Sequence, residues 1–333
     1  MPGKVNPDEL LAHVFGRTGA ADETVRQGPA FGEDAAGIDV SGAEGGGTLV
    51  VSSDPISLAA SQVGTLGVHV ACNDVAASGA DPRWLTVVIL LPGDGGESSS
   101  KPLEEITRDL DAAAGEVGAS IVGGHSEYVD ALERPLLSLT AMGRTERFVP
   151  TSGAEPGDRV VLTKAAGIEG TAILAADFGD DLVADDETLE RARTFLEEIS
   201  VVPDARVLRD VATAMHDPTE GGVVAGAYEL ARASDVRLEV DRDAVPIREE
   251  TRVLCEAADV DPLRIFGSGA LLATVPPDEV DGVLADLEST GLEAAEIGTV
   301  RESDGEPALE LGGETVADPV EDDLYPLWAA QDE

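Results

Sequence analysis

Residues 72–80 read Cys-Asn-Asp-Val-Ala-Ala-Ser-Gly-Ala, a polar pair followed by a run of small residues. The surrounding segment, residues 63–78, has the apolar spacing of a helix. Asn and Asp are poor helix formers and here interrupt an apolar surface, whereas the small residues permit close packing. We therefore predict a closely packed helix that carries Asn73 and Asp74 for a functional reason. A helix cap or a polar pair in the core is the alternative.

Two more acidic segments precede this helix, Gly32-Glu33-Asp34-Ala35-Ala36 and Ser52-Ser53-Asp54-Pro55. We place Asp34 in a loop and Asp54 at the end of a buried strand over residues 48–53. Taken singly, such an Asp is typical of a turn or a cap. If the three converge, however, desolvation costs several kcal/mol without a compensating charge. Mg²⁺ with carboxylate, water and phosphate oxygens is the usual solution, so the trio predicts a nucleotide enzyme.

The charge of the chain is its strongest compositional feature. Asp and Glu number 66 against 22 Lys and Arg, which gives a net charge of −44, and the lysines are Lys4, Lys101 and Lys164. A lysine-poor acidic surface stays hydrated near 1 M salt, where the Debye length is about 3 Å, so we predict a halophilic protein. An ordinary acidic surface is the alternative. Nucleic acid is excluded as a partner because it requires basic patches.

Length and hydrophobicity indicate a folded chain of two domains. The chain has 333 residues, 43% of them hydrophobic, enough for two cores. Pro and Gly cluster over residues 149–158, so we predict domains at 1–150 and 151–333. Cys72 and Cys255 fit a reducing cytosol, and the sequence has no signal-peptide core or membrane-spanning run, which predicts a cytoplasmic location.

A glycine motif, Gly123-Gly124-His125-Ser126-Glu127, follows a strand predicted at residues 120–122. Glycines there let backbone amides approach phosphate oxygens, with His125 donating to phosphate and Glu127 as a further metal ligand. A tight turn at the end of the strand is the alternative.

The segment from Met215 to Gly222, Met-His-Asp-Pro-Thr-Glu-Gly-Gly, opens a helix in the second half. Thr219 or Asp217 can cap this helix, and the exposed amides at Gly221 and Gly222 form an anion site. An ordinary cap does not need His216 and Asp217, which we predict to contact substrate or phosphate. The chain lacks the GxxxxGK[ST] phosphate loop.

The order of these motifs resembles the aminoimidazole ribonucleotide (AIR) synthetase-like superfamily over roughly residues 30 to 300. The segment at residues 72–80 is the most specific part. Residues 248–257, 261–263 and 216–222 look most like the carbamoyl dehydratase of hydrogenase maturation. Other members are thiamin-monophosphate kinase and selenophosphate synthetase.

The resemblance implies an α+β fold of two domains. The N-terminal domain would form a β-barrel across a homodimer, and the C-terminal domain would be an α/β sandwich. It further implies ATP and Mg²⁺, with Asp34, Asp54 and Asp74 holding metal and phosphates. Gly123, Gly124 and Asn73 would line the nucleotide, and Lys164 would stabilise charge.

Two departures limit the resemblance. The family's dehydratase acts on a cysteine at its own C-terminus, whereas this sequence has none after Cys255, and residues 266–269 read Phe-Gly-Ser-Gly in place of the family's glutamate-glycine pair. We therefore expect an ATP-dependent enzyme that acts on a free small molecule. A metabolite kinase, or a nucleotide-binding protein without turnover that works with a maturation partner protein, is the alternative.

Overall fold

The computed structural model describes residues 7–15, 17–42, 46–57, 62–93, 100–303, 305 and 307–331. The first half is built on a six-stranded sheet with the strand order β1-β2-β3-β6-β4-β5. Its strands are β1 (Val25–Gln27), β2 (Ala36–Asp39), β3 (Thr48–Ile56), β4 (Asp81–Pro92), β5 (Ser120–Val129) and β6 (Leu136–Thr145). The sheet is open, with β1 at one edge and β5 at the other, so the described chain does not by itself close the predicted barrel.

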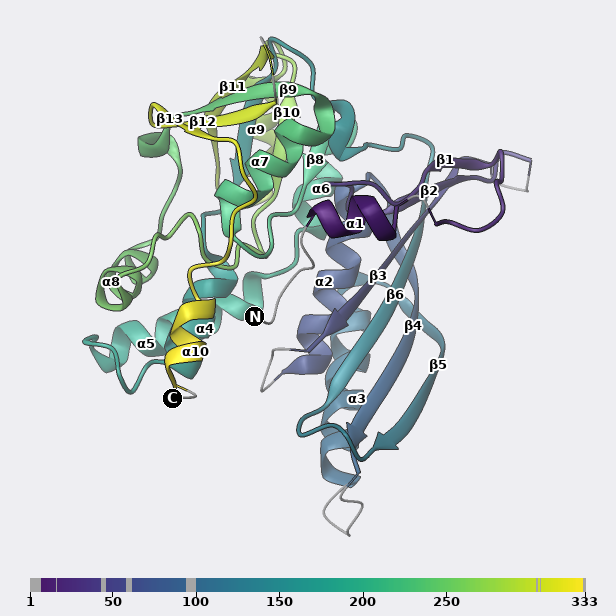
Figure 1. Cartoon of the computed structure of the whole chain (residues 1–333), viewed down its shortest axis with the longest axis vertical. Coiled ribbons are helices and arrows are strands. Elements are labelled where there is room, and N and C mark those ends of the chain that lie inside the picture. The colour runs from purple at the N-terminus through teal and green to yellow at the C-terminus, as the bar shows by residue number, and fades with distance from the viewer. Residues whose placement is uncertain are drawn as a thin grey trace.

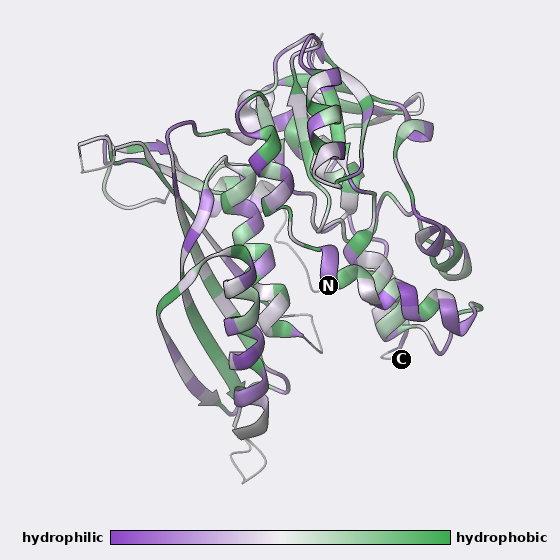
Figure 2. Ribbon diagram, turned by 180° about the vertical axis from the view of Figure 1, so that it is seen from behind, coloured by the Kyte–Doolittle hydropathy of each residue, from purple (hydrophilic) through white to green (hydrophobic). Residues whose placement is uncertain are grey.

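Helices α2 (Val63–Ala77) and α3 (Ser100–Val117) lie on one face of this sheet (Figure 1). In Figure 2 much of the length of its long strands has the green colour of hydrophobic residues. A short helix, α1 (Pro7–His13), precedes β1.

The small residues predicted to favour close packing do so in α2. A Cβ on Gly64 would lie 2.6 Å from the carbonyl oxygen of Ile106 in α3, and one on Gly67 would lie 2.7 Å from Leu139 in β6. Most of α2 is buried because helix α6 (Val202–Leu208) of the second half packs on it as well. The buried side chains of α2, the first sheet, α6 and part of the second sheet form one hydrophobic cluster. Helix α2 therefore carries its polar pair into the junction between the two halves.

The second half contains a seven-stranded sheet with the order β13-β12-β9-β11-β7-β10-β8. Its strands are β7 (Arg159–Thr163), β8 (Ala214–His216), β9 (Val236–Val240), β10 (Leu272–Val275), β11 (Ala294–Glu302), β12 (Ala308–Leu311) and β13 (Glu314–Val316). The other helices are α4 (Ile168–Asp177), α5 (Asp186–Arg193), α7 (Gly222–Ser234), α8 (Glu249–Ala258), α9 (Val280–Ser289) and α10 (Tyr325–Gln331), with 3₁₀ turns at Thr151–Gly153, Thr194–Glu198 and Arg242–Ala244. Two separate sheets with helices agree with the predicted α+β class.

Three local predictions differ from the structure. Strand β3 runs on to Ile56, so Asp54 lies within the strand and not at its end. The helix predicted over residues 203–214 ends at Leu208, before strand β8. The cap residue of α7 is Gly221, in a left-handed conformation and without a side-chain cap, so neither Thr219 nor Asp217 caps that helix.

In the described part of the chain, no helix is both long enough and apolar enough to cross a membrane.

Candidate functional site

Four aspartates line one end of a cavity of about 500 Å³ between the two halves of the chain. Asp34 comes from the loop before β2, Asp54 from β3 and Asp74 from α2, while Asp217 follows β8. The Ser52 hydroxyl lies 3.0 Å from an oxygen of Asp54 and 2.5 Å from an oxygen of Asp74. The structure thus brings together the three aspartates of the sequence prediction and adds Asp217 to them.

Burial and mutual repulsion dominate the electrostatics of this cluster. Asp74 is 8% exposed and Asp217 is 2% exposed. Burial, followed by the negative charges of Asp54, Asp217 and Asp34, raises the pKa of Asp74 well above its ordinary value. Burial also raises the pKa of Asp217, with Asp34 adding to the effect. A cation placed among these groups would reverse both shifts.

The four aspartates offer carboxylate oxygens as ligands, and such oxygens suit a hard divalent cation. Neither carboxylate oxygen of Asp217 has a hydrogen-bond partner among the described residues. Across that same part of the chain, no three His, Cys, Asp or Glu side chains stand in a ready-made metal-binding arrangement. The aspartates therefore provide ligand atoms that suit Mg²⁺, but they are not arranged as a preformed coordination shell.

His216 links the acidic cluster to the second half of the chain. Its Nδ1 lies 2.5 Å from Asp34 Oδ1, and its Nε2 lies 2.9 Å from Glu229 Oε2 of α7. Burial alone would lower the pKa of His216, but Asp34 and Glu229 together raise it well above its ordinary value. Through its two ring nitrogens the side chain therefore links Asp34 of the first half to Glu229 of the second. Sequence reasoning missed Glu229, although it is an acidic residue in a helix that is otherwise mostly buried.

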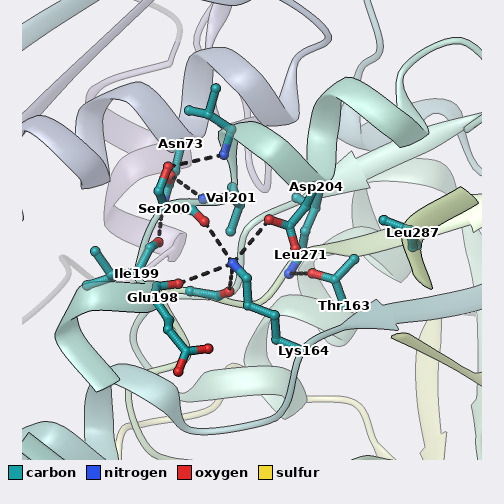
Figure 3. Close-up of polar contacts among 12 residues, drawn as sticks. Asn73, Thr163, Lys164, Glu198, Ile199, Ser200, Val201, Asp204, Leu271 and Leu287 are labelled. Carbon is teal, nitrogen blue, oxygen red and sulfur yellow. Dashed lines mark hydrogen bonds and ion pairs between the residues drawn. The ribbon is translucent and has the colours of Figure 1, made fainter. Parts of the chain in front are cut away.

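Asn73 and Lys164 both form hydrogen bonds with the backbone of residues 198–201 (Figure 3). The side-chain amide of Asn73 donates to the Ile199 carbonyl at 2.9 Å and accepts from the Val201 amide at 2.8 Å. The Lys164 ammonium donates to the carbonyls of Glu198, Ser200 and Gly269 at 3.1, 2.7 and 2.8 Å, and it pairs with Asp204 at 3.1 Å.

The bonds of Asn73 join the two halves of the chain, whereas those of Lys164 hold together segments of the second half. Asn73 is completely buried, and burial lowers the pKa of Lys164 while Asp204 opposes the shift. Neither residue lines the cavity. Asn73 therefore connects the two halves and Lys164 connects segments of the second half, while the nucleotide-binding and charge-stabilising roles predicted for them stay predictions.

The glycine motif of the first half lies apart from the aspartates. Gly123, Gly124, His125 and Glu127 belong to edge strand β5, which continues to Val129 and makes no turn after residue 122. Gly124 is required there because a Cβ would lie 2.0 Å from the Val87 carbonyl oxygen of β4. His125 Nε2 lies 3.1 Å from Glu127 Oε2, both side chains are exposed, and neither lines the cavity.

The glycine pair before α7 also differs from its predicted anion site. The Gly221 amide donates to Asp322 at 2.7 Å, so a carboxylate of this chain occupies the position expected for phosphate. A Cβ on Gly222 would lie 2.5 Å from the Ile265 carbonyl oxygen, so close packing accounts for the glycine at this position.

Comparison with known proteins identifies the two halves. The family model described as AIR synthase related protein, N-terminal domain, matches residues 32–145, and that of the C-terminal domain matches residues 155–308. The carbamoyl dehydratase HypE of Azotobacter vinelandii is 31% identical over 272 residues, which are 76% of this chain and 75% of that protein.

Two solved structures share the fold. One, titled AaThiL complexed with AMPPCP and TMP, has a TM-score of 0.74 and 22% identity, covering 95% of this chain and 96% of that one. Another, hydrogenase maturation protein HypE in complex with ATP, has a TM-score of 0.66 and 23% identity, covering 95% of each chain.

Proposed function

The chain belongs to the AIR synthase-related family and to its hydrogenase-maturation branch, and from this premise we propose that it is an ATP-utilising, Mg²⁺-dependent enzyme. It uses ATP to activate an amide-type or phosphate oxygen of a small second substrate. The observation that carries the proposal is the convergence of Asp34, Asp54, Asp74 and Asp217 at one end of a cavity. A buried acidic group of this kind favours the binding of a cation, which a magnesium nucleotide provides.

In this proposal the four aspartates hold Mg²⁺, which when bound neutralises charge on the phosphoryl oxygens. Ser52 orients Asp54 and Asp74 through its two short contacts. His216 positions Asp34 through its Nδ1, and Glu229 of α7 in turn holds the Nε2 of His216. Burial of Asp74 and Asp217 keeps bulk water from their carboxylates, which would strengthen their attraction for a cation.

We further propose that the chain works as a homodimer with domains at 1–150 and 151–333. Support comes from edge strand β5, which is exposed along most of its length, including Ile121 at 42%, Val122 at 58% and Tyr128 at 49%. Such an edge offers unpaired backbone groups to a second copy. Gly123, Gly124, His125 and Glu127 would then reach a nucleotide only through the dimer.

An isotope experiment separates the proposed reaction from its alternatives. Candidate carboxamides labelled with ¹⁸O at the carbonyl are incubated with the protein, ATP and Mg²⁺ in molar KCl, and all products are identified by mass spectrometry. Oxygen activation joins the substrate oxygen to the γ-phosphorus, releases ADP and, after the carbon–oxygen bond breaks, gives labelled inorganic phosphate. A kinase instead leaves the phosphoryl group on the product. ATP binding without turnover of any candidate would contradict the enzymatic proposal.

A further inference from the structure

The acidic cluster at the cavity is divided between the two halves of the chain. Asp54 and Asp74 belong to β3 and α2 of the first half, whereas Asp217 follows β8 of the second. Mg²⁺ tolerates little deviation from octahedral geometry, with its ligand oxygens about 2.0–2.1 Å from the ion. The spacing between α2 and β8 therefore decides how well these carboxylates can share one cation.

Asn73, the residue beside Asp74, joins α2 to the second half by a two-pronged contact. Its side-chain amide donates to the Ile199 carbonyl at 2.9 Å and accepts from the Val201 amide at 2.8 Å, and Asn73 is completely buried. An ionised aspartate at this position would accept but not donate, and an alanine would do neither. The contact therefore fixes both the distance and the rotation of α2 relative to residues 199–201.

Residues 198–201 are in turn held by the second half (Figure 3). The Lys164 ammonium donates to the carbonyls of Glu198 and Ser200. It also pairs with Asp204, which is fully buried. Asn73 thus attaches α2 to a segment that has its own buried anchor.

Two strand pairings carry the connection from Lys164 to Asp217. Lys164 directly follows β7, and Asp217 directly follows β8. Both strands pair with β10, in which Leu272 lies opposite Leu162 on one side and His216 on the other. The ends of β7 and β8 are therefore aligned through one residue of the sheet. Buried side-chain bonds and sheet pairing together lead without interruption from α2 to Asp217.

Another contact between the halves lies away from the cavity wall. Asp81, at the start of β4, accepts from Arg206 Nε at 2.7 Å and from Arg209 Nη1 at 2.8 Å. The Asp81 side chain is 45% exposed. Exposed ion pairs contribute little in molar salt, where they are screened. Of these two contacts, only that of Asn73 holds α2, the helix that carries Asp74.

We propose that Asn73 is a positioning residue of the magnesium site: by fixing α2 to residues 199–201, it sets the spacing between Asp74 and Asp217 to suit Mg²⁺. The inference rests on the proposed function, because it concerns the cation bound with ATP. Asn73 does not line the cavity, so it acts through Asp74. Loss of the contact should therefore weaken the binding of Mg²⁺ more than that of Ca²⁺, which accepts longer and more variable bonds of about 2.3–2.6 Å.

Calorimetric titration of the full chain with ATP in molar KCl, with either Mg²⁺ or Ca²⁺, tests this inference. The measured quantity is the ratio of the two ATP affinities. We expect the wild type to favour Mg²⁺. Asn73→Ala should lower the Mg-ATP affinity at least about tenfold and the Ca-ATP affinity less than about threefold. A residue that only stabilised the fold would change both affinities alike, or neither, in the folded protein.

Two more variants complete the test, and circular dichroism checks that each is folded. Asn73→Gln keeps both the donor and the acceptor, so it serves if Asn73→Ala does not fold. Its side chain is one methylene longer and should shift α2, so the affinity ratio should fall here as well. Asp81→Asn weakens the other contact between the halves and is the matched control, which should keep the wild-type ratio.

The wild-type ratio in the Asn73 variants, or an equal fall in Asp81→Asn, would overturn the inference. A wild type that does not bind Mg-ATP would overturn the proposed function together with this inference. A wild type that binds Mg-ATP while the Asn73 variants keep its ratio contradicts this inference alone.

Discussion

Replacement of Glu169 by glutamine should stabilise the free protein, and by an amount that depends on pH. Burial raises the pKa of Glu169 from 4.5 to about 7. The folded state therefore binds a proton more tightly than the unfolded state does. This contribution to stability is fully present below pH 4.5, falls as the pH rises to about 7, and is absent above that.

The size of the effect follows from the pKa. Each pKa unit corresponds to about 1.4 kcal/mol, so the carboxylate costs the folded protein about 3 kcal/mol at pH 8. At pH 5 the cost is under about 1 kcal/mol, because Glu169 is then mostly protonated in the folded state and only partly ionised in the unfolded state. Glutamine keeps the shape of the side chain and carries no charge. The variant should therefore gain up to about 3 kcal/mol at pH 8 and much less at pH 5.

Urea unfolding in molar KCl measures this difference, since urea is uncharged and leaves the ionic strength the same. Glu256→Gln, which is exposed, corrects for the general loss of one negative charge. The reasoning is refuted if Glu169→Gln is no more stable than the wild type at pH 8, or if its gain is the same at both pH values.

Three further predictions concern the links between the halves and the charge of the chain. Asn73→Ala should lower the free energy of unfolding by about 2–4 kcal/mol, because it leaves the Ile199 carbonyl and the Val201 amide buried without partners; a urea midpoint like that of the wild type would contradict this. Glu229→Gln should lower the pKa of His216, since it removes one of the two carboxylates that raise it; an NMR titration of the imidazole checks this, and an unchanged pKa argues against the link. Stability should rise with KCl because the net charge is −44; full stability at low salt would oppose halophilic adaptation.

The parts of the fold that depend on local sequence were predictable. Small residues and apolar spacing predicted α2 within one residue of its end, and the short apolar run at residues 48–53 predicted the first part of β3. The glycine pair in β5 misled the prediction because glycine usually ends a strand, whereas Gly124 here permits close approach to Val87. The sheet order itself joins segments far apart in sequence, and no local pattern encodes it.

The part of the candidate site that consists of aspartates was predictable from the sequence. Asp34, Asp54 and Asp74 do meet at one cavity, because their segments are brought together by β3, α2 and the loop before β2. Lys164 could not be placed, since its bonding partners lie 34 to 105 residues away along the chain.

Calorimetric titration with ATP tests the central claim most directly. It compares wild type, Asp74→Asn and the control Asp111→Asn, which is exposed on α3 of the same half, each in molar KCl with Mg²⁺ or with EDTA. We predict that wild type and control bind ATP only with Mg²⁺. Asp74→Asn should stay folded by circular dichroism and lose Mg-ATP affinity about a hundredfold or more. Wild-type affinity in Asp74→Asn, or ATP binding that does not depend on Mg²⁺, would contradict the account.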